Sequence, residues 1–320
     1  MTDLSLDFTQ ILGFQSAREV YGKKLVELGA EREDIVVLTA DLLASNKLGE
    51  FQMAFPDRFF NVGVAEANMM GIAAGLALDG WVPFVSTFAT FASMRACEQV
   101  RTDIAYVNLP VKIIATMSGV SGGAAGPTHS GIEDMGIMRG MPNMTVIAPS
   151  DPLQMTQFVE EALEVPGPVY IRLGRGDDPV IYHDQKIEIG KAIVAREGSD
   201  VTIVACGTVM RDALEARQQL KSDGISARVL DVHTVKPIDT EALVAAAKET
   251  GHIVTVEDHF VTGGLGSAVA EVLAESGTSC RFKRLGLPDV FPIIGEPHEL
   301  FHHYGYDADG ISAAVKQILK

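Results

Sequence analysis

The stretch NVGVAEANMMGIAAGLALDG, residues 61–80, decides how the first half of this chain is organised. It links a short strand and turn, expected at 58–64, to an apolar helix of small residues that begins near Glu66. A carboxylate among alanine, valine and methionine side chains is predicted to be poorly solvated, and such a group can share a proton with a ring nitrogen. The stretch alone also fits a simpler interpretation, an acidic side chain that complements the helix dipole.

The composition limits the classes of protein to consider. The chain has 320 residues, enough for two ordinary domains, and 42 acidic against 26 basic residues give a net charge of −16. This balance, without a cluster of Lys and Arg, argues against a nucleic-acid partner. Three widely separated cysteines, Cys97, Cys206 and Cys280, fit a reducing compartment such as the cytoplasm.

Targeting and membrane signals are not expected in this chain. The first ten residues, MTDLSLDFTQ, contain acidic residues and no basic segment, so they do not resemble a signal peptide. No uncharged apolar run reaches the roughly 18 residues needed to span a bilayer. We therefore expect no membrane association.

Strand-like and helical patterns alternate along the whole chain, which predicts an α/β fold with largely parallel sheets. Strands are expected at 35–39, 82–86, 111–117, 146–148, 169–173, 201–205, 227–231 and 253–257. Helices are expected at 17–28, 48–55, 89–108, 152–162, 209–220, 240–249 and 309–319 and after Glu66. The segment GRGDDPVIYHDQ, 174–185, has the character of a linker. We therefore predict two doubly wound domains, residues 10–180 and 186–320.

Five motifs, in order, resemble the C-terminal half of transketolase, and in particular the smaller subunit of split transketolases. They are TADLLASN at 39–46, VGVAEANMMGIAAGLAL at 62–78, STFATF at 86–91, GPTHSGIEDMGIMRGMPNM at 126–144 and VEDHFVTGGLGSAVAEVL at 256–273. The resemblance extends from residue 17 to about 319. It implies a pyrimidine-binding domain and a C-terminal domain of a thiamine-diphosphate enzyme. Related motifs occur in deoxyxylulose-phosphate synthase and the beta subunits of 2-oxo-acid dehydrogenases, and GPTH favours the transketolase and synthase branches.

The resemblance implies a cofactor site. Glu66 would be the carboxylate that stabilises the imino tautomer of the aminopyrimidine, and Phe88 and Phe91 would flank that ring, with Phe91 stacked on its face. We expect both aromatic side chains at the start of a helix, although core packing is the ordinary role of such a pair. Asp41 and Leu42 would lie beside the bent cofactor.

The resemblance also implies a substrate site. His129, in the glycine-rich loop SGVSGGAAGPTHSG at 118–131, matches a histidine that contacts the substrate's oxygen atoms, although a lone histidine is more often structural. Arg18, Ser45 and Arg175 match a clamp for the phosphate of a sugar phosphate, which would also accept a sulfonate.

Two positions depart from the transketolase pattern. Met117 stands where a phosphate-binding histidine is usual, and Ala125 stands where an aspartate usually binds a substrate hydroxyl. These departures leave the cofactor chemistry intact but question the ordinary pentose phosphates as substrates. A branched or otherwise modified ketose is an alternative.

The C-terminal half offers fewer signals. VEDHF resembles a metal-binding pair, but a histidine among acidic residues is more often a satisfied strand end, so we expect no metal site. His233, Glu257, Asp258 and His259 receive no catalytic role from the resemblance, and GGLG at 263–266 opens a helix that could hold an anion. We assign this half to assembly or to an unknown role.

The chain contains no GDG motif, which in this superfamily binds the diphosphate through magnesium. The resemblance therefore implies a partner, an N-terminal transketolase subunit that carries GDG and Mg2+, in an α2β2 assembly. The expected activity is transfer of a two-carbon ketol unit from a ketose phosphate to an aldose. Two alternatives stay open: a synthase-like or dehydrogenase-like thiamine-diphosphate carboligase subunit, and a non-catalytic partner subunit.

Overall fold

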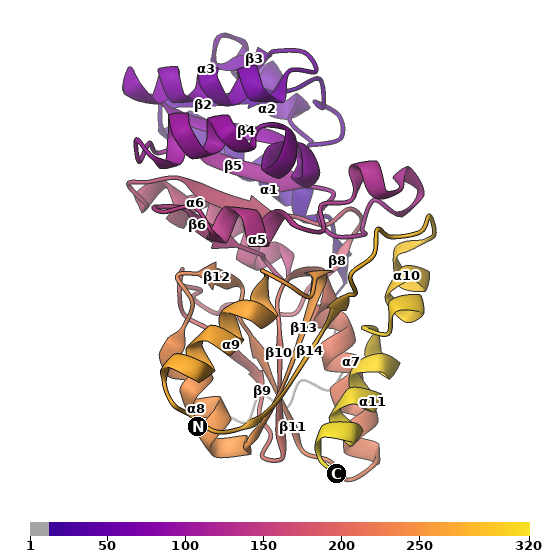
Figure 1. The fold of residues 1–320 in the computed structure, drawn as a ribbon. Helices are drawn as coiled ribbons and strands as arrows, with labels where there is room; N and C mark the ends of the chain where they lie inside the picture. The colour runs from indigo at the N-terminus through magenta and orange to yellow at the C-terminus, as the bar shows by residue number, and fades with distance from the viewer. Residues whose placement is uncertain (1–12) are drawn as a thin grey trace.

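The structure, a computed structural model, describes residues 13–320, so the expectation about the first ten residues lies outside the described residues. Two sheets are each covered on both faces by helices, one built by the first half of the chain and one by the second (Figure 1). This confirms the predicted α/β class with two doubly wound sheets. The residue at which one domain ends and the next begins stays a prediction.

The first sheet has seven strands in the order β12-β6-β7-β5-β4-β2-β3. Its six parallel strands are β2 (Ile35–Thr39), β3 (Phe59–Asn61), β4 (Val82–Phe88), β5 (Lys112–Thr116), β6 (Thr145–Ile147) and β7 (Val169–Arg172). The main helices over it are α1 (Ala17–Glu31), α2 (Gly49–Ala54), α3 (Glu66–Leu78), α5 (Asp134–Arg139) and α6 (Pro152–Glu164). Central strands such as β2 are buried throughout, which explains their continuous apolar sequences.

The second sheet has five strands in the order β14-β13-β10-β11-β9. Four are parallel, β10 (Val201–Ala205), β11 (Ala227–Asp231), β13 (His252–Phe260) and β14 (Arg281–Leu287), and the edge strand β9 (Ile193–Arg196) is antiparallel. Its helices are α7 (Met210–Ser222), α8 (Thr240–Thr250), α9 (Leu265–Glu275) and α11 (Ala308–Ile318), and α10 (Pro297–Tyr304) precedes α11. In Figure 1, α8 and α9 cover one face and α7 and α11 the other.

The second half of the sequence contributes one strand to the first sheet. Strand β12 (Thr234–Lys236) belongs to the second half of the sequence, yet it pairs antiparallel with β6 at the edge of the first sheet. A smaller two-stranded sheet pairs β1 (Phe14–Gln15) with β8 (Asp178–Pro179). Strand β8 lies inside the segment predicted as a linker. Neither pairing was predicted, because both strands are too short to have a recognisable period.

The helix predicted at 89–108 is not a regular α-helix. It consists of two π-helical segments, Phe91–Arg95 and Val100–Ala105, separated by a short α-helical piece, α4 (Cys97–Gln99). The Ser93 and Thr102 hydroxyls donate to backbone carbonyls four residues earlier, and such bonds compete with the regular backbone pattern. Wide turns of this kind are frequent at functional sites.

Among residues 13–320, no helix combines the length and the apolar character required to cross a membrane.

Candidate active site

Most of the predicted site residues lie at one end of the first sheet, directly after the carboxyl ends of its parallel strands. Asp41 follows β2, Glu66 follows β3, Phe91 follows β4, Met117 follows β5 and Arg175 follows β7. In open α/β sheets ligands bind outside the carboxyl ends of the strands, because loops from neighbouring strands meet there. The topology therefore brings together residues that are far apart in the sequence.

Glu66 is the first residue of α3 and its side chain is only 1% exposed. This confirms the predicted poor solvation. Arg95 Nη1 donates to Glu66 Oε1 at 2.8 Å, whereas Glu66 Oε2 is buried and has no hydrogen-bond partner. A buried carboxylate oxygen without a donor is costly, so this atom is available to a ligand.

Three aromatic rings form a cluster that Arg95 connects to this carboxylate. The centroids of Phe88 and Phe91 are 5.5 Å apart, and the His129 ring lies edge-on to Phe91 at 5.3 Å and to Phe88 at 6.1 Å. Phe88 is the last residue of β4, so the prediction that it lies in a helix was wrong. The cluster nevertheless joins two predicted cofactor residues to the predicted substrate histidine.

The predicted clamp residues also come together. Arg18, near the start of α1, donates from Nη1 to the Ser45 carbonyl oxygen at 2.9 Å, and its buried Nε has no partner. Burial lowers the pKa of Arg18, and the nearby positive charge of Arg175 lowers it further. Because each positive charge disfavours the other, an anion bound between these two guanidinium groups would stabilise both.

Met117 lies against Arg175, one of the predicted clamp residues. It is 2% exposed, adopts a positive φ of 55°, and places its sulfur 3.9 Å from Arg175 Nη1. The position that would carry a histidine in the transketolase pattern thus presents a thioether with no hydrogen-bond donor. Ala125, the second departure, is exposed in the glycine-rich loop.

Asp41 and Leu42 follow β2 at the same end of the sheet. The Asp41 backbone has φ 59°, and its N–H donates to Asn61 Oδ1 at 3.0 Å. Asn61 Nδ2 donates to Asp41 Oδ1 at 3.2 Å. Among residues 13–320, no hydrogen bond or ring contact joins either residue to Glu66, so their cofactor role stays a prediction.

The C-terminal half holds the loop that carries His129. Asp258, at the end of β13, is buried and accepts hydrogen bonds from the Val120 N–H at 3.1 Å and from the Tyr306 hydroxyl at 3.2 Å. Gly119 has φ 58°, and a Cβ there would clash with the Asp258 carboxylate. Burial raises the pKa of Asp258 to about 6. Asp258 therefore has a structural function that the sequence did not reveal.

Arg172 connects the same loop to both halves of the chain. It forms a two-point ion pair with Asp134, with Nε to Oδ2 at 2.9 Å and Nη2 to Oδ1 at 3.0 Å. Its Nη2 also donates to the carbonyl oxygens of Gly131 and Asp258. Both charged side chains are buried. Because both bonds of the ion pair and both bonds to the carbonyl oxygens are formed, Arg172 fixes the end of the glycine-rich loop against β13.

The helix start at GGLG does hold an acidic group, but that group belongs to the chain itself. The Glu257 carboxylate already occupies it, accepting from the Leu265 N–H at 2.7 Å and the Gly266 N–H at 2.8 Å. His259 Nε2 accepts from the Gly136 N–H at 3.3 Å. His233 is buried against the Phe158 ring, and burial lowers the pKa of His233 to about 4. These residues have structural contacts, as the interpretation of VEDHF as a strand end predicted.

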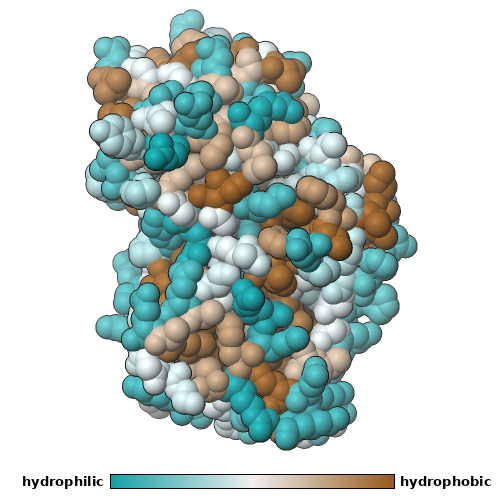
Figure 2. Space-filling model, viewed as in Figure 1, coloured by the Kyte–Doolittle hydropathy of each residue, from teal (hydrophilic) through white to brown (hydrophobic). Residues whose placement is uncertain are grey.

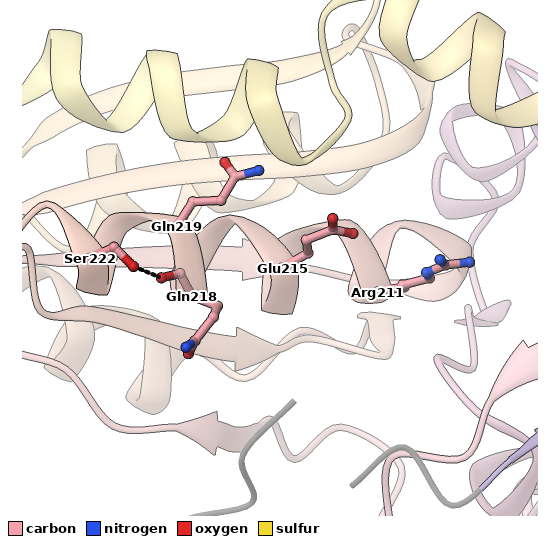
Figure 3. Close-up of a pocket in the computed structure, with 5 residues that line it drawn as sticks. All are labelled: Arg211, Glu215, Gln218, Gln219 and Ser222. Atoms are coloured by element: carbon pink, nitrogen blue, oxygen red, sulfur yellow. Dashed lines mark hydrogen bonds between the residues drawn. The ribbon is translucent and has the colours of Figure 1, made fainter. Parts of the chain in front are cut away.

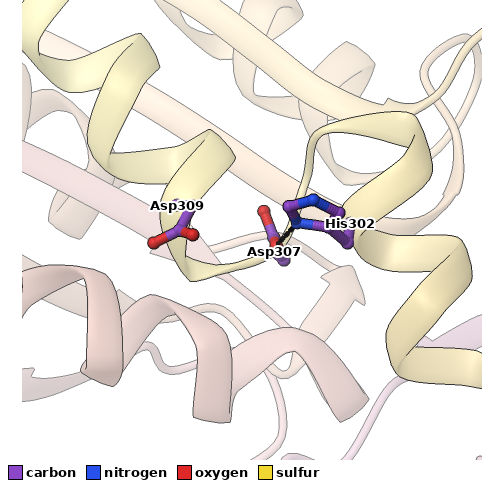
Figure 4. Close-up of side chains that lie close together, drawn as sticks. All are labelled: His302, Asp307 and Asp309. Atoms are coloured by element: carbon purple, nitrogen blue, oxygen red, sulfur yellow. Dashed lines mark hydrogen bonds and ion pairs between the residues drawn. The ribbon is translucent and has the colours of Figure 1, made fainter.

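Two further polar groups lie on the C-terminal half, away from this site. A shallow pocket along α7 is lined by five side chains of that helix, Arg211, Glu215, Gln218, Gln219 and Ser222 (Figure 3). His302, Asp307 and Asp309 lie close together near α11 (Figure 4). Asp307 caps α11 through the Gly310 N–H, and Asp309 accepts from Gln219, so both carboxylates already have structural partners.

Sequence reasoning missed Arg95, Arg172 and Asp258. Arg95 follows Phe91 by four residues, a spacing that places two helical side chains on one face, and this signal was available. Its guanidinium lies 4.0 Å from the Phe91 centroid. The contacts of Arg172 and Asp258 depend on how β7 and β13 approach the loop, which no local pattern encodes.

Comparison with known proteins assigns the class. Residues 15–179 match the family described as "Transketolase, pyrimidine binding domain", and residues 190–311 match "Transketolase, C-terminal domain". The chain belongs to the transketolase family, and it is a transferase subunit of the transketolase type.

Three relatives indicate which kind of transketolase this chain resembles. A chain described as "Split gene transketolase, inactive beta4 tetramer" superposes with a TM-score of 0.87 at 48% identity, covering 96% of this chain and 99% of that one. One of the subunits of an apulose-4-phosphate transketolase from Phocaeicola vulgatus is 39% identical over 95% of this chain and 98% of its own length. A 6-deoxy-6-sulfo-D-fructose transketolase subunit of Clostridium sp. (strain MSTE9) is 42% identical over 94% of both chains. The chain is therefore similar along its whole length to subunits of split transketolases.

Proposed function

We propose that this chain is the pyrimidine-binding subunit of a two-chain, thiamine-diphosphate-dependent transketolase that acts on a modified sugar carrying an anionic group. The observation that carries the proposal is the buried Glu66 carboxylate with one unpartnered oxygen, together with the ring contact between Phe91 and His129. The free cysteines and the acidic composition support a cytoplasmic location.

The residues fit the aminopyrimidine of thiamine diphosphate. A buried carboxylate oxygen without a donor suits a ring nitrogen that bears a proton, and Phe88 and Phe91 supply aromatic surface for the ring. When bound, the cofactor supplies a nucleophilic thiazolium carbon that takes up the two-carbon unit. In this chain Glu66 would hold the proton at Oε2, and the aromatic rings would exclude water from the ring face.

His129 would contact the substrate oxygens next to the reacting carbon. Its Nδ1 lies 2.9 Å from the Thr128 hydroxyl, which leaves Nε2 free to face a ligand. The contact between the His129 and Phe91 rings supports a position of this histidine near the cofactor. The histidine would orient the substrate or stabilise developing charge on an oxygen.

The clamp suits a sugar with an anionic end. Arg18 and Arg175 supply the positive charge, and Met117 in place of a histidine removes one donor and leaves an apolar wall. Such a site would bind either a phosphate or a sulfonate. The named substrates of the two relatives, apulose 4-phosphate and 6-deoxy-6-sulfo-D-fructose, are both unusual sugars with an anionic group and support a non-standard ketose here.

A partner chain with the GDG motif would bind the diphosphate and Mg2+. Exposed apolar side chains next to the His129 loop support a docking surface there, namely Val290, Phe291, Ile293 and Ile294. Apolar residues gather over this side of the molecule in Figure 2, and Ile294 lies against Gly126 of the loop. We propose an α2β2 assembly in which the active site lies between the two chains.

The purified chain alone is expected to bind thiamine diphosphate weakly and to show no ketol transfer, since it has the pyrimidine site without a GDG magnesium site. Adding the GDG-bearing partner should restore both properties in a magnesium-dependent way. Calorimetry and a coupled transfer assay test this. Micromolar, magnesium-dependent cofactor binding by the chain alone would contradict the two-chain proposal.

Arg18→Ala and Arg175→Ala are each expected to raise KM for an anionic sugar about tenfold, because a hydrogen bond to a charged group contributes roughly 1.5–3 kcal/mol. Neutral analogues without the phosphate or sulfonate should be hardly affected. Steady-state kinetics with paired charged and neutral substrates measure the difference. Equal effects on both kinds of substrate would contradict the clamp.

A further inference from the structure

We propose that Arg95 is a positioning residue for the catalytic carboxylate: it pins Glu66 Oε1 so that Oε2 is presented to the cofactor ring. This inference rests on the function proposed above. Arg95 Nη1 lies 2.8 Å from Oε1, and Oε2 is buried without a partner. Among residues 13–320, no other hydrogen bond to the Glu66 side chain is formed, so Arg95 alone distinguishes the two oxygens.

The guanidinium has a second anchor in Phe91. Its central carbon lies 4.0 Å from the Phe91 ring centroid, a favourable cation–π distance. Phe91 and Arg95 are the first and last residues of the same π-helical segment. The widened turn therefore connects the residue proposed to stack on the cofactor with the residue that orients the carboxylate.

Positioning matters here because a carboxylate rotates readily about its terminal bond. Without a fixed donor, either oxygen of Glu66 could face the ring, at different distances and angles. Arg95 is about half exposed, at 49%, whereas Glu66 is 1% exposed, so the pair joins a solvent-accessible cation to a buried anion. A charge-assisted bond of this length holds one orientation of the carboxylate, which lowers the cost of reaching the reactive geometry.

A competing role follows from the same contacts. The planar guanidinium touches Glu66 and Phe91, the two groups proposed to bind the planar aminopyrimidine. If Arg95 instead occupied the place of the ring, cofactor binding would have to displace it. Removal of Arg95 should leave cofactor affinity nearly unchanged if it is a positioning residue, and should tighten binding if the cofactor has to displace it. The distribution of contacts, one oxygen paired and one left free, favours positioning.

The first experiment uses the purified, cofactor-free chain. Thermal melting is compared for wild type, Arg95→Ala, Glu66→Gln and the double variant. Arg95→Ala should lower Tm by about 2–5 °C, and by less than half of that in the Gln background, because the lost interaction needs the carboxylate charge. Arg101→Ala, an exposed arginine of the same helical stretch, is the matched control and should leave Tm unchanged. Equal losses in both backgrounds would overturn the pairing.

The second experiment uses the enzyme reconstituted with its GDG-bearing partner. Arg95→Ala should lower kcat about tenfold to a hundredfold while the Kd for thiamine diphosphate, measured by calorimetry, changes less than about threefold. Arg95→Lys should regain part of the lost rate. A tighter Kd with normal kcat would overturn positioning in favour of the competing role, and an unchanged kcat and Kd would overturn both.

Failure of the proposed function is distinguishable from failure of this inference. If the proposed function is wrong, the wild-type chain reconstituted with its GDG-bearing partner would itself lack ketol transfer. The coupling between Arg95 and Glu66 in the melting experiment would nevertheless persist. That result would remove the positioning role of Arg95 along with the proposed function.

Discussion

Glu66→Gln is expected to abolish ketol transfer in the assembled enzyme and to leave the fold intact. The amide is similar in size, and its oxygen still accepts a hydrogen bond from Arg95, which holds the wild-type carboxylate at 2.8 Å. Its NH2 group, however, replaces the unpartnered Oε2 and neither takes up nor releases the proton that the cofactor ring requires. The rate of the reconstituted variant and its circular dichroism spectrum measure the two expectations.

The proposed role of Glu66 would be wrong if its Gln variant kept more than about a tenth of the wild-type rate, since general acid–base contributions are typically 10²–10⁴-fold.

His129→Ala is expected to have a different effect from Glu66→Gln. It should also lower the rate of transfer, but the affinity for thiamine diphosphate should stay nearly unchanged, because His129 is proposed to contact the substrate.

Arg172→Met is expected to give the largest loss of stability, lowering the free energy of unfolding by about 3–5 kcal/mol. The substitution keeps most of the side-chain volume but leaves the Asp134 carboxylate buried without its cation. It also removes the hydrogen bonds to the Gly131 and Asp258 carbonyl oxygens, which hold the loop against the second sheet. Urea denaturation of the cofactor-free chain measures the change.

The matched control is Arg32→Met. Arg32 pairs with Asp34 in a similar two-point geometry, but both side chains are more than a third exposed, at 36% and 38%. Its removal should change the free energy of unfolding by about 1 kcal/mol or less. If both variants lost the same stability, burial would not be the reason for the importance of Arg172.

Most strands and the burial of Glu66 were predictable from the sequence. Strands β2, β10 and β11 begin and end where they were predicted, because runs such as IVVLT and VTIVA are buried on both faces and have one dominant pattern. The burial of Glu66 followed from the small apolar residues around it. The likeness of five ordered motifs to transketolase then implied which side chains form the candidate cofactor and substrate sites.

Other elements were not predictable, because their reason for forming is not local. The sequence RFKRLGL of β14 has no clear alternation, and it becomes a strand because β13 offers an edge to pair with. The widened helix at 91–105 depends on side-chain hydroxyls that compete for backbone carbonyls. Phe88 ends a strand instead of starting a helix, since it pairs in register with Thr116 of β5, yet its ring still reaches Phe91.

The sequence by itself determined the alternation of strands and helices and the apolar surroundings of Glu66, because these properties depend on side-chain chemistry and on periods of a few residues. Its resemblance to transketolase implied the candidate site residues. Only the tertiary structure decided that Arg95 pairs with one oxygen of Glu66, and that Asp258 and Arg172 fix the His129 loop from the other half of the chain and from β7. Those contacts join atoms separated by 29 to 138 residues, and their geometry exists only when both sheets are packed together.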